Sequence, residues 1–328
     1  MNDSKMISEE LQAKIEHSYE VLRLSAKMSK LYYQKPLIVT YSGGKDSDVM
    51  LQLAIECLDK DDFEVLNSHT TVDAPDTVYY IRNRFSELKQ QGISVSIHYP
   101  TYKDGSFKSM WNLIPKKKMP PTRLVRYCCN ELKETTTPNR FVAVGVREDE
   151  SNIRRGRDDF MIRGKTKKEG QHFGFSHIKD VFETSERERE RLQAQPNDED
   201  VYDCKFIENA KNKKDLYCNP IYKFTENDVW CFIHDRGMNY NPLYDMGYHR
   251  IGCIGCPLGG RNSQLREFAD FPKYKNLYLK AFEQMLKEHI GYESRIDKFE
   301  DANEVFEWWT QSETIKGQMT IDDFLKKE

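Results

Sequence analysis

The sequence lacks a long apolar run, which bears on where the protein can reside. None of its 328 residues belongs to a run approaching the ~20 apolar residues that a membrane-spanning helix requires. The N-terminal segment MNDSKMISEELQAK also lacks the apolar core of a secretion signal. We therefore expect a cytoplasmic protein with no membrane partner.

An excess of basic charge is also missing. The chain has 50 lysine and arginine residues against 53 acidic residues, for a net charge of −3. This balance excludes a chain-wide basic field that would attract nucleic acid. The chain has eight cysteines, which in a reducing compartment are more often metal ligands or reactive thiols than disulfides.

Residues 42–47, Ser-Gly-Gly-Lys-Asp-Ser, form the most informative motif. They follow an apolar run and precede a segment whose apolar residues recur with helical spacing. Gly43 and Gly44 allow backbone N–H groups to approach an anion, and the helix N-terminus and Lys45 add positive charge. The spacing differs from the Walker motif G-x-x-x-x-G-K-[ST]. The sequence therefore predicts a strand–loop–helix phosphate site of another class.

Alternating strands and helices predict the fold class. We expect strands at 37–41, 63–67, 93–99 and 141–146, and helices at about 47–59, 75–91 and 122–134. This order predicts an α/β protein with a doubly wound parallel sheet, which binds ligands beyond the carboxyl ends of its strands. The predicted domains are an N-terminal helix (1–35), a main domain (36–262) and a helical extension (263–328). A charged insertion at about 151–216 would hold a solvated helix and a loop near 195–198.

Two cysteine pairs predict a four-thiolate site. Cys128 and Cys129 are adjacent, and Cys253 and Cys256 have the C-x-x-C spacing. Four thiolates suit either Zn²⁺ or an iron–sulfur cluster, and the glycines at 252 and 255 offer N–H groups to sulfur. We expect packing roles for Cys57 and Cys231. For Cys204 and Cys218 we expect surface or packing roles, while a role as a spare ligand or as a sulfur-carrying thiol stays open.

Several segments together resemble the phosphoadenosine phosphosulfate (PAPS) reductase family, within the PP-loop ATP pyrophosphatase group. The resemblance covers about residues 36–262. The matching segments are Ser42–Ser47 (the PP-loop), Asp73–Thr77 (similar to T-G-x-x-F-P-E-T, without the Thr-Gly start and the Phe), Gly145–Arg154 (G-x-R-x-x-x-S-x-x-R), Asn219–Ile221, Asp228–Trp230 and Asn241–Tyr248. Cys128-Cys129 with Cys253-x-x-Cys256 is similar to the arrangement that holds a [4Fe-4S] cluster in the adenylylsulfate-reducing members.

The resemblance implies an adenine nucleotide alpha hydrolase-like fold and a nucleotide site. The residues implied in nucleotide binding are Ser42, Gly43, Gly44, Lys45, Asp46, Ser47, Asp73 and Gly145. Those implied in catalysis are Lys45, Asp46 (which would help position Mg²⁺), Arg147 and Arg154. The bound nucleotide would be ATP or a sulfonucleotide, PAPS or adenylylsulfate. The two arginines would clamp phosphate or sulfate, or else pair with Glu148, Asp149 or Asp158.

One departure from the family pattern bears on the reaction. Reductases of this family carry a nucleophilic cysteine in a C-terminal E-C-G-L-H segment, whereas the last cysteine here is Cys256. A thiosulfonate intermediate then needs a substitute nucleophile. The sequence therefore favours an ATP-dependent adenylating enzyme in sulfur transfer, similar to Dnd-type DNA phosphorothioation proteins and tRNA thiolases. A cysteine desulfurase would donate the sulfur, and DNA or tRNA is a candidate acceptor.

Two other functions remain open at the level of sequence. One is a thioredoxin-dependent reductase in which Cys204 or Cys218 replaces the missing thiol. The other is a non-catalytic nucleotide or nucleic-acid binding module that uses zinc structurally. Assembly into a homo-oligomer is also left open.

Overall fold

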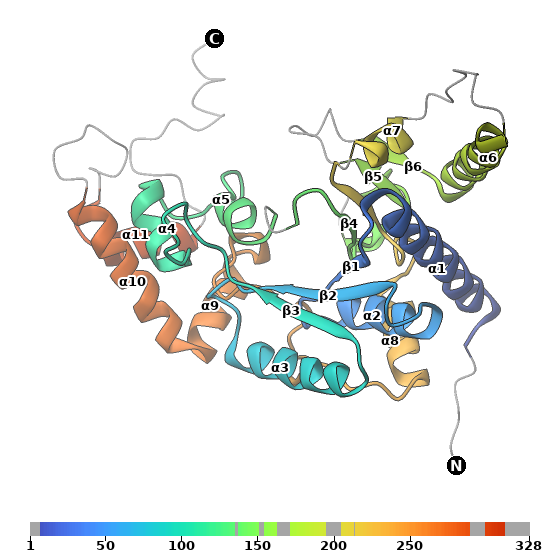
Figure 1. Ribbon diagram of the computed structural model, residues 1–328. Helices are drawn as coiled ribbons and strands as arrows, with labels where there is room; N and C mark the ends of the chain where they lie inside the picture. The colour runs from blue at the N-terminus through green and yellow to red at the C-terminus, as the bar shows by residue number, and fades with distance from the viewer. Residues whose placement is uncertain are drawn as a thin grey trace, which may run out of the picture. The chain divides into compact units, whose positions relative to one another are not determined.

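The structure of the chain is a computed structural model that describes residues 7–134, 137–150, 154–162, 171–194, 205–212, 214–288 and 299–311. The chain forms two compact units, each assembled from separated stretches. The first unit comprises residues 1–67, 76–97 and 137–251, and the second comprises residues 68–75, 98–136 and 252–328. Figure 1 labels most of their helices and strands.

A seven-stranded, mostly parallel sheet has the strand order β3-β2-β1-β4-β7-β5-β6. The strands are β1 (Leu37–Thr40), β2 (Phe63–Ser68), β3 (Ser94–His98), β4 (Phe141–Ala143), β5 (Phe160–Ile162), β6 (Gln171–Phe173) and β7 (Leu216–Cys218). Strand β1 is parallel to both β2 and β4, and β4 is parallel to β7. Because the chain leaves β1 toward β2 and later returns to its other side as β4, the carboxyl end of β1 is a topological switch point.

Alternation along the strands produces two apolar faces. Leu37 and Val39 of β1 belong to the large core cluster, whereas Ile38 belongs to a smaller cluster with Val142 and Tyr217. This is the period of two expected of a strand that is buried on both sides. The predicted α/β sheet is confirmed.

The helices of the first unit are α1 (Glu9–Met28), α2 (Lys45–Cys57), α3 (Pro75–Gln90), α6 (Phe175–Ala194), α7 (Lys205–Lys211) and α8 (Glu226–Asp235). Helix α2 packs against both α1 and α8. The side chain of Ser8 caps α1, and Thr225 forms a capping box with Asp228 at the start of α8. The structure therefore places a helix at each of the expected positions that flank the motif 42–47.

The second unit is largely helical, with α4 (Met110–Lys117), α5 (Tyr127–Cys129), α9 (Arg261–Asp270), α10 (Pro272–Lys287) and α11 (Ala302–Gln311). Helix α10 packs against α4, α9 and α11. Aromatic rings fill its interior: the Trp309 ring lies 4.7 Å from that of Tyr278 and 5.9 Å from that of Phe268. These rings account for the aromatic content of the C-terminal sequence as packing.

Three expectations need correction or comment. The prediction of a helix at 122–134 is wrong for its first residues, because Thr122 and Val125 form a hydrogen-bonded turn after two prolines. The helical part consists of α5 and a π-helical turn at Asn130–Glu134. The charged insertion contains the expected helix, α6, but also the antiparallel strands β5 and β6, which had no sequence signal. The loop expected near 195–198 lies outside the described residues, and the predicted domain division stays a prediction.

No helix within the described ranges has the combination of length and apolar character that crossing a bilayer requires.

Candidate nucleotide site and cysteine site

The loop 42–47 is a tight, internally bonded turn between β1 and α2. The Ser47 hydroxyl donates to the Gly44 carbonyl (2.7 Å) and accepts the Ser42 N–H (3.2 Å). Gly43 has a φ of +72°, a left-handed conformation that favours glycine. A Cβ at this position would also lie 2.8 Å from Ile81 Cγ1. The sequence folds this way locally because glycine permits the bend and the serines close it.

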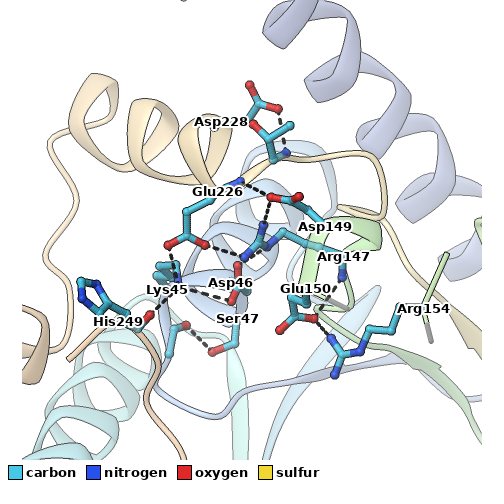
Figure 2. A network of polar contacts seen from close by, with 12 residues as sticks. Lys45, Asp46, Ser47, Arg147, Asp149, Glu150, Arg154, Glu226, Asp228 and His249 are labelled. Atoms are coloured by element: carbon cyan, nitrogen blue, oxygen red, sulfur yellow. Dashed lines mark hydrogen bonds and ion pairs between the residues drawn. The ribbon is translucent and has the colours of Figure 1, made fainter. Parts of the chain in front are cut away.

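Lys45 lies at the start of α2, where the partial positive charge of the helix N-terminus adds to its own. Only 4% of the residue is exposed. Its Nζ lies 3.2 Å from Glu226 Oε1 and 3.3 Å from the His249 carbonyl oxygen, and 5.2 Å from the centre of the Tyr244 ring. Figure 2 shows this ammonium among the polar side chains of the site. Lys45 is thus a largely buried cation at a helix N-terminus, an arrangement that favours an anion.

Arg147 joins the loop to helix α8. Its Nε donates to Asp46 Oδ1 at 2.5 Å and its Nη2 donates to Glu226 Oε2 at 2.8 Å, while Asp149 lies 3.7 Å from Nη1 (Figure 2). Only 2% of Arg147 is exposed. The predicted residues Lys45, Asp46 and Arg147 are therefore brought together around one carboxylate that the sequence reasoning missed, that of Glu226.

Arg154 also lies in this unit, where it forms an ion pair with Glu150 (Figure 2). Burial, together with the positive charges of Arg157 and Arg250, lowers the pKa of its guanidinium to about 10. Of the ion pairs that the sequence offered as alternatives, Arg147 forms the one with Asp149, whereas Arg154 pairs with Glu150. Positive charge from several arginines thus gathers on the same unit as the loop.

Two residues position the loop from the segment after α8, and neither was predicted to have a role. The side-chain N–H₂ of Asn241, which is fully buried, donates to the Gly43 carbonyl and to Thr77 Oγ1, both at 3.0 Å. The Tyr244 hydroxyl accepts the Lys45 N–H at 3.0 Å. Both residues lie in the family-like segment Asn241–Tyr248, which was the available signal.

The remaining predicted nucleotide ligands are Gly145 and Asp73. Gly145 lies behind the loop, where a Cβ would be 3.3 Å from the Asp46 carbonyl oxygen. Asp73 belongs to the second unit, where its carboxylate accepts the Thr70 hydroxyl at 2.7 Å. The structure therefore groups Gly145 with the loop and Asp73 with the cysteines.

All four predicted metal ligands, Cys128, Cys129, Cys253 and Cys256, lie in the second unit, are partly buried and are not joined by disulfides. The hydrogen bond that the Cys128 thiol makes with Cys129 raises the pKa of Cys128, as do burial and the negative charges of the other three cysteines. Burial raises the pKa of Cys253 to about 11. The structure thus brings the four thiols within electrostatic range of one another, although no group of three or more potential ligands among the described residues has a metal-binding arrangement.

The surroundings of these thiols add a cation and correct one expectation. The negative charge of Cys253 raises the pKa of Lys133, and Asp73 and Cys129 act in the same direction. Lys133 is therefore a neighbour of the cysteines that the sequence reasoning missed. The Gly255 N–H donates to Glu267 Oε2 at 2.6 Å, so the expectation that it bonds to sulfur is wrong.

The other cysteines have packing roles where they are described. Cys218 is fully buried in β7, and burial raises its pKa to about 12. Cys57 packs partly buried against the core, and Cys231 accepts a hydrogen bond from Asn227 at 3.5 Å. Cys204 lies outside the described residues.

Comparison with known proteins identifies the family. The model of the phosphoadenosine phosphosulfate reductase domain matches residues 36–258. The chain belongs to this family. Its PP-loop is the loop 42–47.

Curated relatives match this PAPS reductase family member over different shares of its length. The uncharacterized protein MJ0973 of Methanocaldococcus jannaschii is 24% identical over 277 residues, which cover 82% of this chain and 53% of that protein. The chain thus spans about half the length of this relative. The adenosine 5′-phosphosulfate reductase of Anoxybacillus flavithermus is 39% identical over 51 residues, 16% of this chain and 22% of that enzyme.

Solved structures with a similar course of the chain include two enzymes. The phosphoadenylyl-sulfate reductase of Candida auris has a TM-score of 0.40 at 14% identity, covering 72% of this chain and 87% of that one. A U34-tRNA thiolase of Methanococcus maripaludis, with its [4Fe-4S] cluster, has a TM-score of 0.33 at 13% identity, covering 84% and 82%.

Proposed function

We propose that this chain binds an adenine nucleotide at its PP-loop and acts as an adenylating enzyme in sulfur transfer, with a [4Fe-4S] cluster on its four paired cysteines. The observation that carries nucleotide binding is the grouping of Lys45 and Arg147 at the N-terminus of α2. Both are almost fully buried, and each already binds a carboxylate oxygen of Glu226. An anionic phosphate chain could replace that carboxylate with the same two partners.

The residues of the loop suit transfer of an adenylyl group. An acceptor oxygen would attack the α-phosphorus of ATP, and the bond to the β-phosphate oxygen would break to release pyrophosphate. Lys45 and the α2 N-terminus would stabilise the negative charge that develops on the leaving group. A sulfur nucleophile from a donor protein would then displace AMP from the acceptor.

Magnesium would arrive with the nucleotide. Mg²⁺ commonly binds phosphates together with one or two carboxylates. Asp46 is the candidate ligand from the loop, because one of its oxygens accepts a hydrogen bond from Arg147 while its side chain stays partly exposed. Its role toward the metal is part of the proposal.

The cysteine site supports a cluster through its donor set. The four thiols are partly buried, and the negative charges of the other three raise the pKa of Cys128, so its thiolate is unfavourable without a compensating cation. The cluster would be held by Cys128, Cys129, Cys253 and Cys256. It would supply iron that can bind sulfur or accept electrons. Lys133 would compensate part of the remaining negative charge.

Two assays on anaerobically purified protein test this function. We expect exchange of labelled pyrophosphate into ATP in the presence of the acceptor, and loss of exchange in Lys45→Ala. The exposed Lys35→Ala serves as the control. Failure of the wild-type chain to bind any adenine nucleotide, with or without magnesium, would overturn the proposal.

A sulfonucleotide reductase is the second candidate, favoured by the name of the family itself. It would release sulfite from PAPS or adenylylsulfate with thioredoxin as reductant. Cys218 is poorly suited to replace the missing nucleophile because it is fully buried and its pKa is raised to about 12. Cys204 remains the candidate, so sulfite release that is lost in Cys204→Ser would favour the reductase.

A further inference from the structure

The segment 99–126 of the second unit has a charge unlike that of the rest of the chain. It contains seven lysines and arginines and only one acidic residue, Asp104, in a chain whose net charge is −3. Six of the seven cationic residues are exposed: Lys103, Lys116, Lys117, Lys118, Arg123 and Arg126. Glu131 pairs with two of the seven, Lys108 and Lys117, each at 2.8 Å. Most of this basic charge therefore lies on the surface.

A hairpin within this segment presents aromatic rings. Thr101 and Phe107 form an antiparallel bridge, and the Lys108 N–H donates to the Pro100 carbonyl at 2.7 Å. The hairpin places the Phe107 ring 6.3 Å from that of Tyr99. Phe107 is 66% exposed and Tyr99 is 45% exposed. The His69 ring lies 5.3 Å beyond that of Tyr99, so three rings follow one another at this surface.

The hairpin is held against helix α4, which supplies further cations. The Lys116 ammonium lies 3.8 Å from the centre of the Tyr102 ring, and that of Lys108 lies 5.5 Å from it. The Tyr102 hydroxyl donates to Asn112 Oδ1 at 3.1 Å. Helix α4 is itself anchored by packing against α10. The hairpin and helix α4 therefore hold these rings and cations in place on the second unit.

The same segment continues to the cysteines. The turn after the two prolines exposes Leu124 (94%) between Arg123 and Arg126. Cys128 follows two residues later, and the Tyr127 hydroxyl donates to the Met119 carbonyl at 2.8 Å. A polymer bound along 99–126 would thus end beside the first cysteine pair.

We propose that residues 99–126 form a binding surface for single-stranded nucleic acid. The exposed rings of Tyr99 and Phe107 would stack on bases, and the lysines and arginines would contact phosphates. A single strand suits the surface better than a duplex, because the faces of paired bases are covered by their neighbours. The surface would bring the strand to the cysteine site. Single-stranded nucleic acid would then be the acceptor of the sulfur, an assignment that rests on the proposed sulfur-transfer function.

Fluorescence anisotropy of the full-length chain tests the binding directly. The probes are labelled mixed-sequence RNA and DNA single strands, the corresponding duplexes and vesicles of phosphatidylserine and phosphatidylcholine. We expect single strands to bind more tightly than duplexes. Because counterions are released, log Kd should rise with log salt concentration with a slope of about 0.7 for each phosphate that the protein neutralises.

Three variants separate the contributions of rings and charges. Phe107→Ala should weaken single-strand binding roughly tenfold with little change in salt dependence. The pair Lys116→Glu and Arg123→Glu should weaken binding and also reduce the salt slope by about 0.7 for each phosphate that is no longer neutralised. The exposed Lys35→Glu of the first unit, outside the segment, should do neither. Circular dichroism confirms that each variant is folded.

ATP binding, measured on the same preparations, distinguishes the two proposals. If single-strand binding is absent, unchanged in the variants or weaker than vesicle binding while ATP binds, the nucleic-acid surface is overturned and the nucleotide function stands. If the strand binds as expected but no adenine nucleotide does, the proposed function fails and the surface stands.

Discussion

The carboxylate of Glu226 lies 3.2 Å from the ammonium of Lys45, and its second oxygen accepts a hydrogen bond from Arg147 at 2.8 Å. The two cations best placed for phosphate thus share one carboxylate from the start of α8, as Figure 2 shows. A nucleotide phosphate that uses these cations must compete with Glu226. The side chain is half exposed, so it can move away into solvent.

We therefore expect Glu226→Gln to bind ATP more tightly than the wild type. Removing the negative charge weakens the competing ion pairs, and because partly exposed pairs contribute little, the gain should be about fivefold or less. Isothermal titration calorimetry measures the dissociation constant. Glu87→Gln is the matched control, because Glu87 is equally exposed and pairs with Arg84 at 3.0 Å. Weaker binding by Glu226→Gln would instead identify Glu226 as a ligand of the nucleotide or its metal.

The two glycines of the PP-loop should respond differently to alanine. In Gly43→Ala, an alanine would have to adopt the left-handed backbone conformation of residue 43. Its Cβ would also lie 2.8 Å from the side chain of Ile81, which is buried. We expect a loss of about 2 kcal/mol or more in the free energy of unfolding. At Gly44 the nearest atom would be 3.5 Å away and φ is −97°, so Gly44→Ala should cost less than about 1 kcal/mol. Urea unfolding measures both, and equal losses would contradict the steric explanation.

The sequence was sufficient to predict the central strands and the loop. Leu37–Thr40 is a largely apolar strand, and a short loop with two glycines follows it before Lys45 begins the next helix. Local signals of this kind depend on strand and turn preferences, which act within a few residues. The cysteine pairs were likewise recognisable from their spacing.

Partners that come from distant parts of the chain had no such signal. Glu226 and Asn241 contact the loop from well over a hundred residues away, and an acidic residue at the start of a helix is ordinary capping chemistry. Strands β5 and β6 have three residues each in a charged region. Pairing of β5 with β7 and of β6 with β5 stabilises them, rather than a sequence pattern of their own.

Loss of one thiol should remove the proposed cluster. We expect Cys253→Ser and Cys256→Ser to lose most of their iron and acid-labile sulfide and to unfold more readily, because metal binding contributes to folding free energy. Iron and sulfide analysis of anaerobically purified protein measures the content. Cys57→Ser, a partly buried cysteine of the first unit, should keep the full content. Full iron content in Cys256→Ser would show that the ligand assignment is wrong.

A buried carboxyl group behind the loop should make stability depend on pH. Asp48 is 3% exposed and accepts a hydrogen bond from the Tyr41 hydroxyl at 2.6 Å. Burial raises its pKa from 3.8 to about 7, against the opposing effects of Tyr41, Tyr80 and Arg84; the charge of Asp46 adds to the increase. Below the unfolded pKa of 3.8 both states hold the proton. Between 3.8 and about 7 only the folded state does, so this group's contribution to stability falls as pH rises through that window and is constant above it.

Asp48→Asn removes this titration while keeping the shape of the side chain. We expect the unfolding free energy of the variant, relative to that of the wild type, to increase as pH rises from about 4 to 7. The increase is at most about 1.4 kcal/mol per unit of pKa shift. Urea unfolding at a series of pH values measures the difference, with the exposed Asp61→Asn as control. A variant whose stability differs from the wild type by the same amount at every pH would mean that Asp48 titrates alike in the folded and unfolded states. The carboxyl would then be solvated despite its burial, and the packing of Tyr41 against the PP-loop helix would have to be looser than its 2.6 Å hydrogen bond indicates.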